Sequence, residues 1–340
     1  MKTIFMKGRN IIRKNEITMN KKIQKILATT LSVFFVFSSD AHAYTIRNVA
    51  GTSSQGSFVV GPAKSELSLN PGETKTIELR IQNRMGRTQS FVISFENFVA
   101  SNELDQAVVL AGAEMDTQTS LAQYIRVEKN NFTLEQGDEL LLPVTISIPE
   151  QVAPGGKFGA VVVSAVSLSE NSGTEERAYS GASVVSRIAS LMFVRVNGDI
   201  VTSGTLLDFS TRNNQAVFWS GDIPVRMLFE NTGTVHINPY GIISVKDIFG
   251  DRVGEAQIDP WFVLPGSVRT RDVSLRKEGL LGRYTATLEI NPGYGSTTQM
   301  KEVAFYVVTP IALFVTIIIS AVTVFGTRIV FKKRKEQKLV

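Results

Sequence analysis

Few side chains in this 340-residue chain have the types and spacing that catalysis needs. The chain has no cysteine, and His236 is the one histidine that remains once an expected N-terminal leader is removed. A Cys–His pair or a zinc site built from the usual ligands requires more of both residues. His236 lies between Val235 and Ile237, where it reads as a strand or turn residue. The sequence therefore predicts no catalytic residue, no metal site and no cofactor, and it indicates a protein that is not an enzyme.

Three other segments have residue types that bind ions or phosphate. Asp247, Asp251 and Glu255 surround a Gly turn, but they lack the dense, regular oxygen spacing of a calcium loop. Residues 154–157 (Pro-Gly-Gly-Lys) lack the second half of a phosphate-binding loop, and a tight turn before a strand accounts for them. The pair Glu175-Glu176 lies in a polar segment, where two solvated charges are the plain interpretation.

Short segments of alternating apolar and polar residues predict the strands that would position these side chains. Residues 74–82 alternate cleanly after the turn 70–72 (Asn-Pro-Gly), in which Pro presets φ and Gly accepts a positive φ. Similar segments continue to residue 197, and a second set follows from about residue 200. No long amphipathic helix interrupts them. The pattern predicts an all-β protein with two tandem Ig-like β-sandwiches, at residues 58–197 and 198–306.

The two sets of strands resemble a degenerate repeat. Residues 79–83 match residues 227–231, so that Asn83 corresponds to Asn231, and Gly137 corresponds to Gly266. The offset is 148 residues at the first match and 129 at the second. About 19 extra residues therefore belong to the first set, and we place them within residues 99–122. Residues 167–183 are a second excess, because the corresponding hairpin at 291–298 is much shorter.

Both ends of the chain have the pattern of an exported, anchored protein. Lys21, Lys22 and Lys25 precede an apolar run at 26–37, and residues 41–43 (Ala-His-Ala) fit a cleavage site, so we expect a signal peptide at 1–43. A flexible segment is expected at 44–57. Residues 307–327 contain no charged residue and predict a transmembrane helix. The basic tail at 328–340 predicts a cytoplasmic C-terminus, and thus a single-pass plasma-membrane protein with extracellular sandwiches.

The net charge of +5 arises at the two ends. The first 25 residues contribute +7 and the last 13 contribute +5, which leaves −7 for the remainder. The exported part is thus mildly acidic, and this argues against nucleic acid as a partner.

Three stretches carry a resemblance to a known family: residues 69–83 with their Leu-Asn-Pro-Gly start, residues 148–163 with their glycines, and Gly282-Arg283-Tyr284 with the strand after it. In these the chain resembles the membrane-anchored surface proteins of Gram-positive bacteria that bind WxL-domain proteins. Residues 99–105 differ from that family's Thr/Asn-rich segment. The resemblance implies a WxL-type surface protein as partner of the second sandwich, and peptidoglycan binding by the first.

Together these observations favour a non-enzymatic, membrane-anchored scaffold that holds another surface protein, or the cell wall, near the membrane. The alternative is a membrane-tethered assembly chaperone that pairs strands with exported subunits, because exposed sheet edges can pair with a partner strand.

The partner-binding surface is expected in the polar loop at 167–183. Long loops on rigid scaffolds tend to carry function, and this loop exceeds its counterpart in the second sandwich. We expect Glu175, Glu176, Arg177 and Tyr179 to contact the partner, with Arg177 and Tyr179 as the anchors. The other interpretation is an inert linker, in which case the surface lies on the sheet faces or within residues 99–122.

Overall fold

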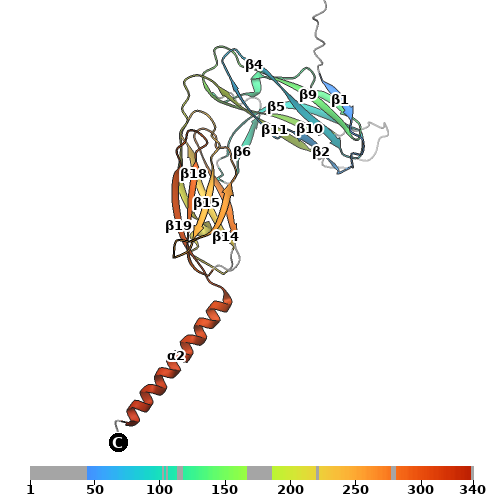
Figure 1. Ribbon diagram of the computed structural model, residues 1–340. Coiled ribbons are helices and arrows are strands. Elements are labelled where there is room, and N and C mark those ends of the chain that lie inside the picture. The colour runs from blue at the N-terminus through green and yellow to red at the C-terminus, as the bar shows by residue number, and fades with distance from the viewer. Residues whose placement is uncertain are drawn as a thin grey trace, which may run out of the picture. The chain divides into compact units, whose positions relative to one another are not determined.

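The computed structural model describes residues 44–101, 103–104, 106–112, 118–166, 186–219, 222–276 and 281–337. Over these residues the protein is mostly β, with a β-sandwich fold and a C-terminal helix (Figure 1). The predicted β-sandwich class is confirmed at this level. The expected signal peptide lies outside the described residues.

The N-terminal sheet pair spans residues 45–196 and has two sheets. The first has the order β1-β9-β4-β2, with β7 also on β9: β1 (Thr45–Asn48), β2 (Ser57–Gly61), β4 (Thr74–Arg84), β7 (Ile125–Arg126) and β9 (Asp138–Ser147). The second has the order β3-β11-β10-β5-β6, with β8 also on β5: β3 (Lys64–Leu69), β5 (Gln89–Ala100), β6 (Val108–Gly112), β8 (Asn131–Leu134), β10 (Gly155–Val166) and β11 (Arg187–Val196). The rings of Phe58 and Phe91, one from each sheet, are 5.1 Å apart. β1 lies within the segment expected to be flexible.

The C-terminal sheet pair spans residues 204–307. One sheet has the order β12-β14-β17: β12 (Gly204–Thr211), β14 (Asp222–Asn231) and β17 (Ser267–Arg276). The other has the order β13-β19-β18-β15-β16: β13 (Val217–Phe218), β15 (Tyr240–Lys246), β16 (Arg252–Ile258), β18 (Gly282–Asn291) and β19 (Gln299–Val307). Two short 3₁₀ turns, η1 (Ala122–Tyr124) and η2 (Arg212–Asn214), complete the two pairs.

Alternation in the sequence explains the core of the C-terminal pair. In β14 every second residue is buried, from Ile223 through Val225, Met227 and Phe229. These side chains pack with residues of both sheets, including Phe305 of β19, in one cluster. Full burial of such a side chain contributes about 1.5–3 kcal/mol, so a one-residue slip of β14 would turn the whole set toward solvent.

β10 is buried on both faces over its first half, unlike β14. Its small residues let the 3₁₀ turn η1 lie directly on the strand. A Cβ added at Gly159 would lie 3.0 Å from the Cβ of Leu121 and 3.2 Å from the backbone N of Ala122. The side-chain oxygen of Asn97 on β5 fixes the same turn, because it accepts hydrogen bonds from the backbone N–H groups of Leu121 and Ala122.

The predicted correspondence of Asn83 with Asn231 appears as the same set of hydrogen bonds in each sheet pair. Each asparagine is fully buried and donates from Nδ2 to the carbonyl four residues later, of Arg87 or Val235. Each accepts at Oδ1 from the N–H two residues later. Each backbone carbonyl accepts from the matched glycine, Gly137 at 2.9 Å or Gly266 at 2.8 Å. A buried side-chain amide whose donor and acceptor groups are all paired strongly constrains the conformation of the turn that it bonds.

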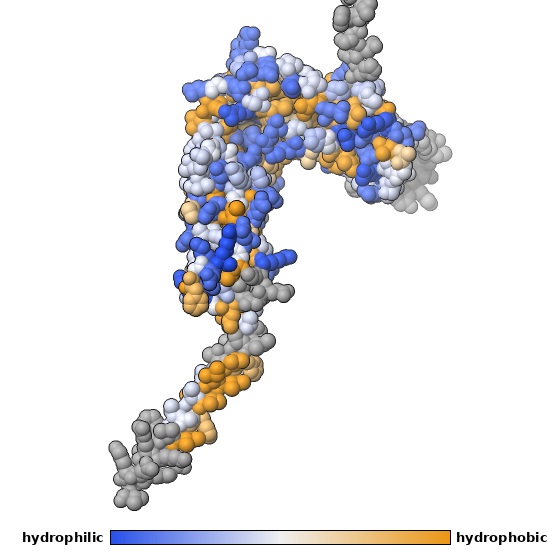
Figure 2. Space-filling view, viewed as in Figure 1, coloured by the Kyte–Doolittle hydropathy of each residue, from blue (hydrophilic) through white to orange (hydrophobic). Residues whose placement is uncertain are grey.

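The C-terminal helix α2 runs from Pro310 to Gln337. Its described apolar side chains, Phe314 and Phe325 among them, are exposed (Figure 2). The helix continues through the residues that were expected to form a separate basic tail. Among the residues that the structure describes, no helix meets the combined length and apolarity needed to cross a membrane. This finding contradicts the transmembrane helix expected at 307–327 and the single-pass plasma-membrane localisation.

Candidate strand-pairing edge and the junction of the sheet pairs

The two sheet pairs share an aromatic cluster, which we call the junction cluster: Phe98 (β5), Phe158 (β10), Phe193 (β11), Phe262 and Leu264. The rings of Phe98 and Phe193 are 5.2 Å apart, and those of Phe193 and Phe262 are 4.8 Å apart. Phe98, Phe158 and Phe193 are almost completely buried. Aromatic pairs at these distances add about 0.5–1.5 kcal/mol beyond the area that they bury. The junction cluster is separate from the core of the C-terminal pair, and it packs side chains of both sheet pairs against one another.

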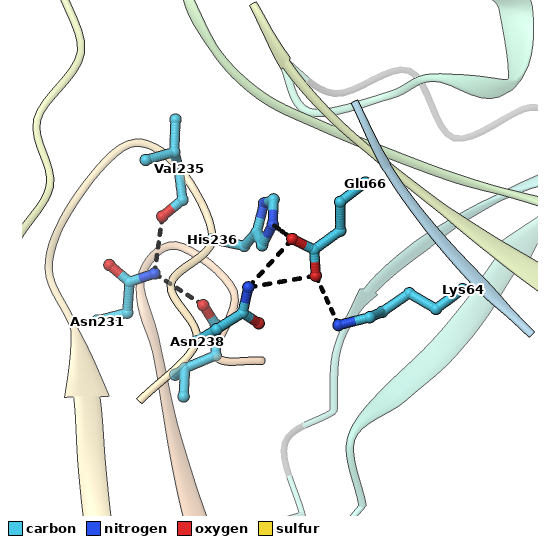
Figure 3. A network of polar contacts seen from close by, with 7 residues as sticks. Lys64, Glu66, Asn231, Val235, His236 and Asn238 are labelled. Atoms are coloured by element: carbon cyan, nitrogen blue, oxygen red, sulfur yellow. Dashed lines mark hydrogen bonds and ion pairs between the residues drawn. The ribbon is translucent and has the colours of Figure 1, made fainter. Parts of the chain in front are cut away.

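Figure 3 shows a charged network around Glu66, and His236 of this network lies 4.9 Å from the ring of Phe193 in the junction cluster. The carboxylate of Glu66 on β3 accepts hydrogen bonds from Asn238 Nδ2 at 3.1 and 3.2 Å, and it lies 3.4 Å from His236 Nε2. Lys64 Nζ donates to the same carboxylate at 2.5 Å. The hydrogen bond from His236, opposed by partial burial and assisted by Lys64, lowers the pKa of Glu66 to about 2. Glu66 is thus ionised at neutral pH and stabilises the contact with residues 236–238.

The residue types that could do chemistry have structural roles here. His236 is held by Glu66 and packs 4.9 Å from the ring of Phe193. Asp247 Oδ1 accepts the backbone N–H groups of Phe249 and Asp251, so it closes its own turn. Glu255 pairs with Arg252 at 2.6 Å. Within the described ranges, no three His, Cys, Asp or Glu side chains gather as a metal site would require.

β6 is an edge strand with an unusual sequence for its position. Its residues 108–112 are Val-Val-Leu-Ala-Gly, without charge or Pro. It pairs antiparallel with β5, where Leu110 is opposite Phe98 and Val109 is opposite Val99. No other strand of the described chain pairs with its far side. The backbone N–H and C=O groups on that side can therefore pair with an incoming strand.

Side chains on the two faces of β6 have different surroundings. Val108 packs against the junction cluster, on the same face as Leu110. Val109 lies on the opposite face and is 42% exposed. Leu110 is itself 37% exposed. An added strand would therefore find apolar side chains on both faces of β6, with Val108 alone packed against the junction cluster, which suits a partner strand that alternates in the usual way.

Most other edge strands have features that discourage pairing. β17, β3 and β16 have charged residues, and β12 has a register shift between Leu206 and Asp208. β2 is followed by Pro62, and β13 has only two residues. Among the edges of the described chain, β6 therefore combines length, apolarity and an open side.

The sequence placed the partner site elsewhere. Glu175, Glu176, Arg177 and Tyr179 lie outside the described residues, so their role stays a prediction. Extra residues were expected within 99–122, the range that contains β6, but the sequence did not indicate a strand there. The run Val108-Val109-Leu110 was the signal, since three consecutive apolar residues, two of them β-branched, shortly before Gly112 suit a short buried or edge strand.

No family model matches the chain, and no curated protein matches it. The chain is similar to solved structures of fimbrial chaperones. The class 5 fimbriae chaperone CfaA is 12% identical, with a TM-score of 0.36, and the match covers 72% of this chain and 98% of CfaA. The SafB chaperone of Salmonella enterica, solved in complex with the SafA pilin, is 12% identical over 76% of this chain and all of its own, with a TM-score of 0.35. The E. coli chaperone DraB is 12% identical, with a TM-score of 0.33, and the match covers 73% of this chain and 97% of DraB.

These findings correct the expected family. The similar structures are fimbrial chaperones and not WxL-interacting surface proteins. The expected WxL-type partner, the membrane contact through a C-terminal helix and the surface scaffold function are therefore wrong. The physical reason is that the residues carrying the resemblance are turn and packing residues. Gly72 has a φ of +82° in a turn, and Gly156 leaves room for the ring of Phe158, which a Cβ would approach to 2.5 Å. Such residues serve any β-sandwich.

Proposed function

We propose that this protein is a non-enzymatic assembly chaperone that binds exported polypeptides by adding their strand to the free edge of β6. One observation supports the proposal above the others: β6 is an apolar, uncharged edge strand with an open side. In strand addition, main-chain hydrogen bonds supply affinity and alternate side chains supply specificity. The proposal includes the predicted signal peptide at 1–43 and the predicted division into sandwiches at 58–197 and 198–306.

The length of β6 favours a chaperone over a permanent scaffold. Five residues form only a few main-chain hydrogen bonds with a partner, and each contributes about 0.5–1.5 kcal/mol net. A client held in this way exchanges readily, as a protein that delivers subunits requires. A scaffold would need a larger and more permanent interface.

The test uses purified protein that spans residues 44–337, together with a fluorescent eleven-residue peptide that alternates valine with threonine. We expect the peptide to bind with a Kd in the micromolar range and to protect the amides of residues 108–112 from hydrogen exchange. A peptide N-methylated at every second residue keeps its side chains but loses the donors on one edge. We expect it to bind at least tenfold more weakly, because the main chain is what β6 recognises.

Val109→Lys is the matched variant on the protein. A lysine on an edge strand disfavours pairing, and we expect at least tenfold weaker binding with unchanged folding. Ile242→Lys is the control, because Ile242 is similarly exposed, at 41%, but lies on the central strand β15. If the N-methylated peptide binds equally well, or if protection appears only away from β6, the proposal is wrong. A bound client that no excess of competing peptide displaces would indicate a scaffold instead.

A further inference from the structure

A cleft of about 790 Å³ lies against the start of β10. Its described lining is mostly amide and hydroxyl side chains, among them Gln123, Tyr124 and Gln151, together with prolines, glycines and the small apolar residues Val152 and Ala153. Lys157 is the one charged side chain in that described lining. The segment 154–157, read from the sequence as a simple turn before a strand, therefore forms one wall of a binding-sized space.

Lys157 is buried to an unusual degree for a lysine, with 6% of its surface exposed. Its Nζ donates a hydrogen bond to the backbone carbonyl of Gln118. An ammonium group has three N–H donors and no acceptor, and no carboxylate of the described residues forms an ion pair with this one. Burial lowers the pKa of Lys157, because desolvation disfavours the charged form. An anion bound beside Nζ would offset that cost.

The main chain of this wall is already paired, so it cannot bind an extended peptide as a strand edge does. The N–H of Gly156 donates to the carbonyl of Thr234, and the N–H of Phe158 donates to the carbonyl of Thr119. On the other side, Gly155, Gly156 and Lys157 pair with β11. What the cleft offers a ligand is a set of amide and hydroxyl groups around one cation, which suits a polyhydroxylated molecule with a single acidic group.

We propose that this cleft binds a saccharide that carries a carboxylate, with Lys157 Nζ as the partner of the carboxylate and the amides of Gln123 and Gln151 facing the sugar hydroxyls. None of the described lining residues of the cleft belongs to β6, so the proposed glycan and a client strand would contact different residues. The inference does not depend on the chaperone function, and the two fail in different experiments.

The experiment is titration calorimetry of the purified protein with trigalacturonic acid, and with galactotriose as the uncharged probe. We expect the acidic trimer to bind at least tenfold more tightly. Lys157→Met should weaken its binding at least tenfold, Lys157→Arg should restore part of it, and Val109→Lys should leave it unchanged. Because only the protonated lysine attracts the anion, affinity should fall as the pH rises through the pKa of Lys157, which the bound carboxylate shifts upward.

A second variant keeps the test valid if Lys157→Met fails to fold. Gln151 is exposed in the cleft wall, and Gln151→Ala should fold normally and weaken the acidic trimer about threefold. Equal binding of the two trimers, or unchanged binding by folded Lys157→Met, would overturn the proposal. So would a short peptide with a free C-terminus that binds through Lys157 more tightly than the trimer does, since the ligand would then be a chain terminus.

Discussion

β6 and β17 are both edge strands near the junction of the sheet pairs, yet their sequences differ completely. β17 has Arg269, Arg271, Asp272 and Arg276 over ten residues, whereas β6 has no charge at all. The charges of β17 are organised: Arg226 of β14 donates to Asp272 through both Nε and Nη2, at 2.7 and 2.8 Å. An incoming strand would have to desolvate these groups. The comparison teaches that this protein protects one edge of the junction and leaves the other open.

The same comparison separates stability from binding. The side chains that hold β6 in place come from the aromatic core beneath it, while those that guard β17 lie in solvent. Changes in the core should therefore alter the fold and the β6 edge together. Changes at the two edges should alter association and leave the fold intact.

Removal of the core beneath β6 should have the largest effect. Phe193 is fully buried and packs against Phe98, which is opposite Leu110 of β6. Truncation leaves a cavity, and we expect Phe193→Ala to lower the free energy of unfolding by about 3–5 kcal/mol. Urea unfolding measures this, and hydrogen exchange should show earlier opening at β6 than at β17. Phe249→Ala is the control, because Phe249 is 84% exposed and should change stability by less than about 0.5 kcal/mol. Equal losses in the two variants would contradict the placement of the core.

Removal of the charges from β17 should allow this edge strand to pair with another copy of the protein. In the double variant Arg271→Val, Asp272→Val, a continuous β-forming surface replaces the exposed charges at the middle of β17. We expect self-association to rise about tenfold in sedimentation experiments, because an unguarded edge pairs with another copy. Arg283→Val is the control on the central strand β18, and it should remain monomeric. A monomeric double variant would show that charge is not what protects β17.

Glu66 tests what a charge on a third edge, β3, contributes to the junction. We expect Glu66→Gln to lower the free energy of unfolding at pH 7 by about 1 kcal/mol, a modest value because solvent screens a carboxylate that is 36% exposed. The folded-state pKa is about 2, below the ordinary 4.5. The contribution is therefore complete above pH 4.5 and lost as the pH falls toward 2. Urea unfolding at pH 7 and pH 3 should show the two proteins converging in acid. A constant difference would rule out the ion network as its source.

The smallest effect is expected at Asp272. The hydrogen bond from Arg226 lowers the pKa of Asp272, but its side chain is 42% exposed. We expect Asp272→Asn to cost about 0.5 kcal/mol at pH 7. Because the folded-state pKa is depressed, this difference should vanish as the pH falls below the ordinary range of a carboxyl group. It should also shrink in 1 M NaCl, whereas a loss that salt does not change would indicate packing instead of charge.

Local sequence predicted much of the fold where a strand has one buried face. The segment at 74–82 alternates strictly and became β4, and the match of Asn83 with Asn231 anticipated two corners with the same hydrogen bonds. The excess of about 19 residues within 99–122 stays a prediction. The sequence could not predict that residues 108–112 form the outer strand of a sheet. The position of a strand in a sheet depends on pairing between residues that are far apart in the sequence. The lining of the Lys157 cleft has the same origin, since it brings Gln118 and Thr234 together.

The parallel pairing of β3 with β11 has a consequence for how the protein folds during its synthesis. Lys64 pairs with Leu191, so the chain between them must be complete before this part of the sheet can close. Contacts between residues so distant in sequence are slow to form, because the chain must first lose the entropy of the intervening loop. This part of the sandwich therefore stays open during synthesis until more than a hundred residues behind β3 have emerged.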